Sequence, residues 1–403
     1  MNWKRQITAF LAGQTITLFG SMLVQFAITW YIARETSSGL YVTLSVLCSF
    51  GPQILLSIFS GVWADRYNKK MLIILSDGGI ALATLILAIL MARGASGIWL
   101  LFIFSAVRSA GSGIQMPAIQ AILPQLVPKD KLMRINGITN SIHSTINLVS
   151  PAAAGAILSF GAFHYLLLID VVTAAIGISI LIGIPFLHKA KEKEAGEHAG
   201  YFDELKAGIR YSLNHSFVRK LFIFSTLFAI LIAPCAILNV LMVTRTFGGD
   251  YWYLTANEIA FFAGAVIGGV LLSTWGGFRN RMDTFTLGIV VFGIFTFIMG
   301  FTYNFIVYLA VIFIIGIAMP FGNTPVTVMI QEKVEPQMMG RVFGLYSIIF
   351  SSFIPLGTLI FGPLADTMPI QWLMIASGIL LTILGVVLRF IRSFYREGLP
   401  ETV

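Results

Sequence analysis

Charged residues are scarce in this sequence. Only 11% of its 403 residues are charged, whereas 57% are hydrophobic. An ordinary soluble domain carries about 25% charged residues. A soluble protein with so few charges would expose apolar patches larger than those that stay monomeric in water. The composition therefore excludes an ordinary soluble domain.

Residues that bind metals or carry out catalysis are also few. The two cysteines, Cys48 and Cys235, each lie inside an apolar run and predict buried small side chains rather than metal ligands. The five histidines are scattered and form no catalytic cluster with acidic or hydroxyl residues. The phosphate-binding pattern GxxxxGK[ST] does not occur, so ATP hydrolysis by this chain is unsupported. We expect no metal, no cofactor and no enzymatic activity.

What the chain has instead is a series of apolar runs from end to end. About 20 apolar residues cross a bilayer as a helix. Runs of this kind predict an all-α integral membrane protein with twelve transmembrane helices, joined by short connectors that contain Gly, Pro or Asn. The predicted spans are 7–33, 41–64, 72–92, 98–126, 133–160, 164–187, 217–245, 254–276, 283–302, 304–330, 339–366 and 369–391.

The basic residues show which side of the membrane each loop faces. The net charge is +8, but the Lys and Arg residues concentrate in alternate loops and form no basic stripe interleaved with aromatics. Nucleic acid is therefore not an expected partner. Because cytoplasmic loops carry the excess of Lys and Arg, both termini are predicted to be cytoplasmic. The first apolar run continues to about Ala33 without a cleavage site, so we interpret it as an uncleaved span.

The longest polar segment, 188–216, divides the chain in the middle. It begins as a charged linker, and Phe202, Leu205, Ile209 and Leu213 then fall on one helical face. This pattern predicts a basic amphipathic helix on the inner membrane surface. The predicted domains are an N-terminal six-helix bundle over 1–187, the linker with its helix over 188–216, and a C-terminal six-helix bundle over 217–403.

The two predicted bundles share spacings that point to a duplicated unit. Pro117 precedes Pro128 by the same distance as Pro325 precedes Pro336, and an Arg followed by a glycine three residues later comes next in both. The fifth span then carries Ser150, Pro151 and Gly155, and the eleventh carries Pro355 and Gly357. Repeated, pseudo-symmetric halves with the substrate site at their interface are a transporter architecture.

The loop after the second span identifies a family resemblance. It reads Gly61-Val62-Trp63-Ala64-Asp65-Arg66-Tyr67-Asn68-Lys69-Lys70, which resembles the G-x-L-A-D-R-x-G-R-[KR] loop of the major facilitator superfamily. Asn68 stands at the usual Gly and tolerates a left-handed turn. The resemblance covers the whole chain and implies two pseudo-symmetric six-helix bundles that transport a small molecule by alternating access, with a monomer as the usual state.

Further motifs resemble the macrolide-efflux branch of the drug/proton antiporters. These are Asn2-Trp3-Lys4-Arg5, Ala12-Gly13-Gln14, Val107-Arg108-Ser109 and Gly340-Arg341-Val342-Phe343-Gly344. The resemblance implies a proton-driven exporter of amphipathic small molecules, with no cofactor and the proton gradient as energy source. It also implies a multi-pass protein of the cell membrane, the inner membrane of a bacterium.

Three alternatives stay open. Siderophore or metabolite exporters are near neighbours of the macrolide-efflux branch. An importer or uncoupled facilitator of the same fold would place more charged and amide groups in its cavity than this chain offers. A lipid scramblase or membrane enzyme is a different class, which the scattered histidines do not favour.

The same loop is expected to form an inner gate. By resemblance, this loop holds the inner ends of the two halves together, and Asp65 would lie near the start of the eleventh span, where Arg341 is an ion-pair partner. The basic residues of the loop also serve as topology signals. The expected gate residues are Gly61, Asp65, Arg66, Lys69, Lys70 and Arg341.

Ionisable side chains within spans are the candidates for proton coupling. Such groups are costly in lipid and usually face a cavity or a partner, and a low dielectric favours the neutral form of a carboxyl group. The candidates are Asp77, Arg108, Asp170 and Glu258. Arg108 is predicted to pair with a carboxylate, with Asp77 as one partner. For Glu258 the alternative is a helix cap beside Thr255 and Asn257.

The substrate cavity and the helix bends are predicted from polar, aromatic and proline residues near the middle of spans. A large, mostly apolar cavity with few polar groups suits amphipathic drugs. The cavity candidates are Gln25, Trp30, Asn147, Asn239 and Phe321. The helix-bend residues are Ser150, Pro151, Gly155 and Pro355, and Ser150 departs from the glycine that antiporters of the superfamily carry before this proline.

Overall fold

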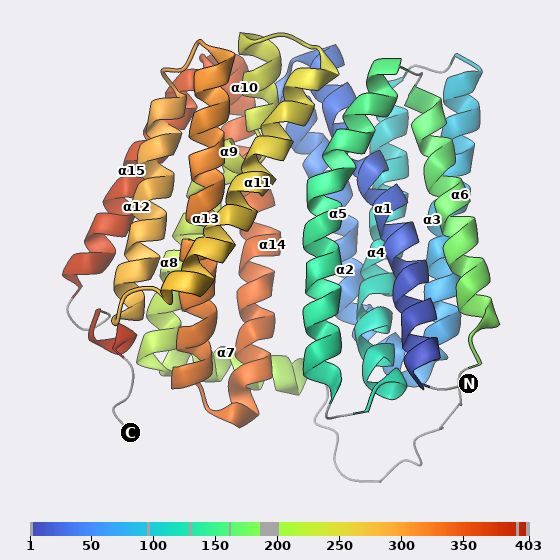
Figure 1. Ribbon diagram of the computed structural model, residues 1–403, viewed down its shortest axis with the longest axis horizontal. Coiled ribbons are helices and arrows are strands. Elements are labelled where there is room, and N and C mark those ends of the chain that lie inside the picture. The colour runs from blue at the N-terminus through green and yellow to red at the C-terminus, as the bar shows by residue number, and fades with distance from the viewer. Residues whose placement is uncertain are drawn as a thin grey trace. The chain divides into compact units, whose positions relative to one another are not determined.

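The chain folds as a set of long helices (Figure 1). The computed structural model describes residues 3–94, 97–128, 131–160, 163–185, 201–391 and 395–399, and this part of the chain contains no strand. The helices are α1 (Trp3–Thr36), α2 (Gly39–Arg66), α3 (Lys69–Ala92), α4 (Ile98–Leu126), α5 (Leu132–Phe160), α6 (Phe163–Gly183), α7 (Tyr201–Asn214), α8 (Ser216–Leu231), α9 (Ala233–Ala236), α10 (Asn239–Thr246), α11 (Tyr251–Trp275), α12 (Arg281–Met299), α13 (Phe305–Lys333), α14 (Pro336–Thr367) and α15 (Ile370–Phe390), followed by a 3₁₀ turn, η2 (Arg396–Gly398).

Ten of the described helices are long and apolar enough to cross a membrane, which confirms the all-α integral membrane fold. They are α1, α2, α3, α4, α6, α11, α12, α13, α14 and α15. The predicted spans 72–92 and 304–330 correspond to the separate helices α3 and α13. Two predicted spans are not among the ten, namely the polar helix α5 and the interrupted segment α8–α10. The count of twelve stays a prediction that depends on these two.

The seventh predicted span is interrupted at a proline. Sequence predicts one span over 217–245, but α8 ends at Leu231, the four-residue α9 contains Pro234, and α10 begins at Asn239. Proline has no N–H to donate and its ring clashes with the carbonyl four residues earlier, so it kinks or breaks a helix but is tolerated in the first turn. Pro234 lies in the first turn of α9, after α8 has ended. Ser377 of α15 donates its hydroxyl to the carbonyl oxygen of Leu231. In lipid such freed carbonyls need a neighbouring donor.

Contacts within the chain group it into two compact units. Unit 1 consists of Met1–Thr36, Leu44–Gly196 and Asp250–Thr255, and unit 2 of Ser37–Thr43, Glu197–Gly249 and Ala256–Val403. Thus the first turn of α2 packs within unit 2, and the first turns of α11 pack within unit 1. The domain boundaries predicted from the sequence stay a prediction.

Close helix packing in each unit depends on small residues. In unit 1, α1 packs on α6, where a Cβ on Gly177 would lie 2.1 Å from the hydroxyl oxygen of Thr17 and 3.0 Å from the carbonyl oxygen of Gly13. In unit 2, α12 packs on α15, where a Cβ on Gly378 would lie 2.3 Å from the backbone nitrogen of Phe297. Membrane helices associate through such close backbone approach, because lipid provides no hydrophobic drive between them.

The duplication inferred from the prolines extends to tertiary contacts. A Cβ on Gly155 of α5 would lie 1.6 Å from the hydroxyl oxygen of Thr255, and a Cβ on Gly362 of α14 would lie 1.7 Å from that of Thr43. Gly155 and Gly362 each follow the repeated arginine, Arg134 or Arg341, by 21 residues. The first crossing lies in unit 1 and the second in unit 2, so equivalent helices of the repeat cross at equivalent residues.

The helix starts after the second and eighth spans are also equivalent. Asn68 accepts a hydrogen bond from the backbone N–H of Met71 at 3.3 Å and caps α3, and Asn280 accepts one from Met282 at 2.9 Å and caps α12. The backbone of Asn68 is extended, with φ of −64° and ψ of 110°, so this position does not use the left-handed conformation that Asn tolerates. The residue is suited to its place as an N-cap, where Asn is among the preferred types.

The predicted linker helix is present as α7 in unit 2. Gly208 faces α14, where a Cβ would lie 3.2 Å from the Cβ of Arg341, and Ser212 is buried. Ile209 and Leu213 are exposed on the adjacent face of the helix, about 100° around its axis, and leave apolar side chains uncovered, as an interfacial helix requires. The side chains of Phe202 and Leu205 lie outside the described residues.

Candidate functional site

A buried ion pair joins α4 and α6 in unit 1. The Arg108 guanidinium donates to Asp170 and to the hydroxyl oxygen of Thr84, and both charged residues are buried. Asp170 also accepts from the hydroxyls of Ser21 at 3.3 Å and Thr84 at 3.2 Å. Hence the carboxylate that pairs with Arg108 is Asp170 of α6, and the predicted pairing with Asp77 is wrong in this structure.

Asp77 and Gln115 make a second polar contact between α3 and α4. Asp77 precedes Thr84 by seven residues on α3, as Arg108 precedes Gln115 by seven on α4, and Gln115 donates its amide N–H to Asp77 Oδ1. Seven residues are about two helical turns, which places each pair on one helical face. The neighbouring helices α3 and α4 are therefore linked by polar contacts at two levels, which we call polar rungs. The first rung joins Thr84 to Arg108 and includes Asp170, and the second joins Asp77 to Gln115.

The second rung is incompletely satisfied. Asp77 is 2% exposed, and its Oδ2 atom has no hydrogen-bond partner among the described residues. An uncompensated buried charge is strongly destabilising, so a buried carboxyl group without a cation is held in the neutral form. With Arg108 committed to Asp170, the arrangement is consistent with a protonated Asp77.

Glu258 lies in a separate polar cluster in unit 2. The Asn257 amide donates to Glu258 Oε1 at 3.3 Å, and the Tyr308 hydroxyl of α13 donates to Asn257 Oδ1 at 2.8 Å. Since α11 begins at Tyr251, Glu258 lies about two turns inside the helix, and the alternative that it caps the helix start is wrong.

The first half of helix α5 exposes a series of polar side chains. The exposed polar residues of α5 are Arg134, Asn136, Asn140, Ser141, Ser144, Thr145 and, near the end of the helix, Ser159. A helix with so broad a polar face is not stable against lipid, because unsatisfied polar groups there cost several kcal/mol. The polar face of α5 therefore borders water or protein rather than lipid.

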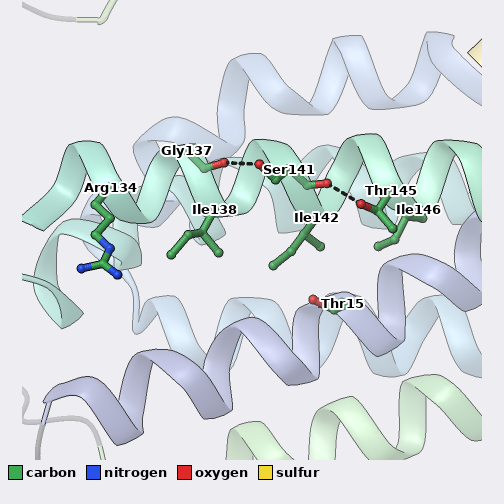
Figure 2. Close-up of a pocket in the computed structure, with 8 residues that line it drawn as sticks. All are labelled: Thr15, Arg134, Gly137, Ile138, Ser141, Ile142, Thr145 and Ile146. Carbon is green, nitrogen blue, oxygen red and sulfur yellow. Dashed lines mark hydrogen bonds between the residues drawn. The ribbon is translucent and has the colours of Figure 1, made fainter. Parts of the chain in front are cut away.

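A groove of about 560 Å³ runs along this face between α5 and α1 (Figure 2). Figure 2 shows Ile138 and Ile142 projecting from α5 toward the side of α1 that carries Thr15, with Arg134 at one end. The groove residues are Thr15, Arg134, Gly137, Ile138, Ser141, Ile142, Thr145 and Ile146. The sequence analysis did not propose these residues, although the row of hydroxyl residues on α5 is visible in the sequence.

Only part of the expected inner gate can be compared with the structure. The side chains of Gly61, Asp65 and Arg66 lie outside the described residues. The Lys70 ammonium donates to the carbonyl oxygens of Ile182 at 2.9 Å and Ile184 at 2.8 Å. Lys70 therefore caps the carboxyl end of α6, a favourable place for a cation. Lys69 is half-buried at the start of α3, and Arg341 packs against α7.

The remaining predicted residues fall into two groups. Gln25, Asn147 and Phe321 are half-buried, whereas Trp30 is 1% exposed beside Phe26 and Asn239 is 8% exposed at the start of α10. Whether these residues contact a substrate stays a prediction. The predicted helix-bend residues all lie within helices, Ser150, Pro151 and Gly155 in α5 and Pro355 in α14. Gly155 is the residue of α5 against which Thr255 of α11 packs.

The ion pair between Arg245 and Asp366 in unit 2 was not predicted from the sequence. Asp366 of α14 accepts from the backbone N–H groups of Gly39 at 2.7 Å and Leu40 at 2.9 Å and from the Ser38 hydroxyl at 2.8 Å. Arg245 of α10 donates to Asp366 at 2.8 Å and to the carbonyl oxygen of Ser37. Asp366 thus caps α2 from another helix, more than 300 residues away in sequence.

Comparison with known proteins agrees with this architecture. The Major Facilitator Superfamily profile matches residues 10–358 and 221–402. Macrolide efflux protein A of Streptococcus pyogenes is 29% identical over 400 residues, which cover 99% of this chain and 98% of that protein. The Staphyloferrin A transporter of Staphylococcus aureus is 24% identical over 395 residues, which cover 98% of this chain and 98% of that protein.

Among solved structures, a bacterial homologue of the human lysosomal transporter Spinster superposes with a TM-score of 0.72 at 15% identity, covering 99% of both chains. At that identity the likeness concerns the fold alone. The profile match across the chain and the helices long enough to span a membrane agree with this fold. The chain belongs to the Major Facilitator Superfamily and is a multi-pass membrane protein.

Proposed function

We propose that this protein is a proton-coupled exporter of amphipathic small molecules that works by alternating access. The proposal places it in the bacterial plasma membrane as a monomer, with cytoplasmic termini, no cofactor and no enzymatic activity. The similarity to a macrolide efflux protein supports the direction of transport and the substrate class. The two polar rungs of α3 and α4 are the observation that carries the coupling.

The rungs offer Arg108 two alternative carboxylates. In the described arrangement Arg108 pairs with Asp170, and Asp77 has an oxygen without a partner. A proton that binds Asp170 from the outer side neutralises this carboxylate and frees the guanidinium. Arg108 then pairs with Asp77, which releases its proton toward the inner side. These two steps take up one proton from the outer side and release one to the inner side, and the buried charge stays balanced. The starting state returns when the proton on Asp170 passes to Asp77 and Arg108 pairs with Asp170 again.

Glu258 is retained as the competing proton carrier. It is an acidic residue inside a helix, but the described residues around it include only amide and hydroxyl partners and no cation. A carboxyl group without a cation partner can titrate, but it has no charged group to exchange. Substitution of Glu258 therefore provides a matched control for substitutions of Asp77 and Asp170.

Transport into liposomes with an acidic lumen tests the proposal. An antiporter accumulates substrate in the acidic compartment, and the substrate panel should include a macrolide. We expect accumulation by the native protein, its loss in Asp77→Asn and Asp170→Asn, and its retention in Glu258→Gln. Transport that ignores the gradient would indicate an uncoupled facilitator. Loss in Glu258→Gln alone would transfer the coupling role to unit 2.

A further inference from the structure

The groove between α5 and α1 has two distinct rows of side chains. Arg134, Ile138, Ile142 and Ile146 follow one another at intervals of four residues, as do Gly137, Ser141 and Thr145 beside them. Residues four apart lie on one side of a helix. The groove therefore offers an apolar row that ends in a cation, next to a row of small hydroxyl side chains.

The hydroxyl groups present acceptors rather than donors to the groove. Ser141 donates to the carbonyl oxygen of Gly137 at 3.0 Å, and Thr145 donates to that of Ser141 at 2.9 Å, as the dashed lines in Figure 2 show. Thr15 of α1 likewise donates to Leu11 at 2.6 Å. Because each hydroxyl proton is used within its own helix, the remaining lone pairs favour a ligand that carries hydroxyl or N–H donors.

Among the described residues that line the groove, Arg134 carries the only charge and there is no carboxylate. Within the described part of the chain, Arg134 is exposed and has no hydrogen-bond or ion-pair partner. Its equivalent in the other repeat, Arg341, is covered by α7 at Gly208. The repeat therefore gives one arginine a packing partner and leaves the other open to the groove.

We propose that this groove binds amphipathic substrates through an anionic group, such as a carboxylate, held by Arg134. The apolar side of the substrate lies along Ile138, Ile142 and Ile146, and its hydroxyl groups donate to Ser141 and Thr145. This inference rests on the proposed exporter function and adds hydroxylated amphipathic anions to the macrolide-like substrates proposed there. A basic amine is disfavoured, because the groove offers it a like charge and no counterion.

Equilibrium binding to the full chain in nanodiscs of zwitterionic lipid tests this assignment. The probe is cholate, a rigid hydroxylated carboxylate, compared with its uncharged amide and with an amine of the same ring system. Loss of a charge-assisted hydrogen bond weakens binding about tenfold or more. We expect the carboxylate to bind about tenfold more tightly than the amide, and Arg134→Gln to remove that difference while Arg134→Lys retains most of it.

Two further variants separate binding in the groove from general effects. Arg93→Gln removes an exposed arginine at the end of α3 that does not line the groove, so its affinity for cholate should stay within about twofold of the native value. Gly137→Leu fills the groove, because a Cβ at Gly137 has no heavy atom within 4 Å, and should weaken the carboxylate and the amide alike.

Equal affinities for carboxylate and amide, absence of cholate binding, or equal losses in the two arginine variants would overturn the assignment. If anionic lipid in the nanodisc abolishes the preference for the carboxylate, the groove is a lipid site and the assignment to substrate is wrong. These outcomes are distinct from failure of the exporter proposal. Gradient-driven transport of a macrolide that is unaffected by Arg134→Gln would leave the exporter in place and remove only the anion site.

Discussion

At the residue scale, the described core of unit 1 buries one cation, Arg108, and two carboxyl groups, Asp170 and Asp77. The charge is balanced when Asp170 is ionised and Asp77 is neutral. Asp170 accepts from Arg108, Thr84 and Ser21, whereas among the described residues Asp77 accepts only from Gln115. Substitution of the two acidic residues should therefore affect the balance of buried charge differently. Removing the charge of Asp170 leaves Arg108 without a described counterion, but replacing a neutral Asp77 by Asn changes little in the balance of charge.

The first prediction concerns the stability of these variants. Asp170→Asn should lower the free energy of unfolding by about 3–5 kcal/mol, the usual effect of breaking a buried ion pair. Asp77→Asn should lower it by about 1 kcal/mol or less, the scale of one membrane hydrogen bond. Denaturant unfolding of the purified protein measures both. In the double variant Asp170→Asn with Arg108→Leu, part of the loss should be recovered, and equal losses in the two single variants would contradict a neutral Asp77.

A second prediction concerns the cap that Asp366 provides to α2. Replacing Asp366 by Ala removes the acceptor for the N–H groups of Gly39 and Leu40. Loss of an N-cap costs about 1 kcal/mol, so amide hydrogen exchange in the first turn of α2 should become roughly five- to tenfold faster. Exchange in α12, which has its own cap at Asn280, is the internal control. Unchanged exchange at residues 39 and 40 would show that the cap is dispensable.

At the element scale, the two glycine crossings make a matched pair. Gly155→Ala and Gly362→Ala each place a methyl group within 2 Å of a threonine hydroxyl, and such overpacking typically costs about 1–3 kcal/mol. Both variants should lower the melting temperature by similar amounts. Gly137→Ala and Gly344→Ala are the controls, because a methyl group there has no heavy atom within 4 Å, and they should leave the melting temperature unchanged or slightly raised.

Removal of the threonine hydroxyl should rescue the crossings. Thr255→Ala in the Gly155→Ala background and Thr43→Ala in the Gly362→Ala background each take away the oxygen with the severest overlap. If only one crossing responds to substitution, the equivalence of the repeats does not extend to their packing. If neither responds, the helices separate at these points without cost and the close approach contributes nothing to stability.

The interruption between α8 and α10 is also a property of an element. Ser377 of α15 supplies a donor to Leu231 at the end of α8, just before Pro234. Ser377→Ala leaves this carbonyl oxygen without the donor and should lower the free energy of unfolding by about 1 kcal/mol. Thr382→Ala is a control on the same helix, since Thr382 donates only to its own backbone at Gly378.

At the scale of the whole molecule, the sequence was sufficient for the fold but not for the partners of the buried charges. Span-length apolar runs predicted twelve spans, of which ten correspond to described helices long and apolar enough to cross a membrane. The matched prolines predicted the repeat that the glycine crossings extend. The partner of Arg108 could not be read from the sequence, because Asp170 is 62 residues away and reaches Arg108 only because α4 and α6 both pack on α3. The cap from Asp366 to α2 depends on tertiary packing in the same way.

Substrate-driven proton flux tests the central claim most directly. Liposomes loaded with a transported substrate and a pH-sensitive dye, without an initial pH gradient, report whether substrate efflux draws protons inward. The account predicts lumenal acidification for the native protein and Glu258→Gln, and none for Asp77→Asn. Substrate efflux without acidification by the native protein, or undiminished acidification by Asp77→Asn, would contradict proton coupling through the two polar rungs.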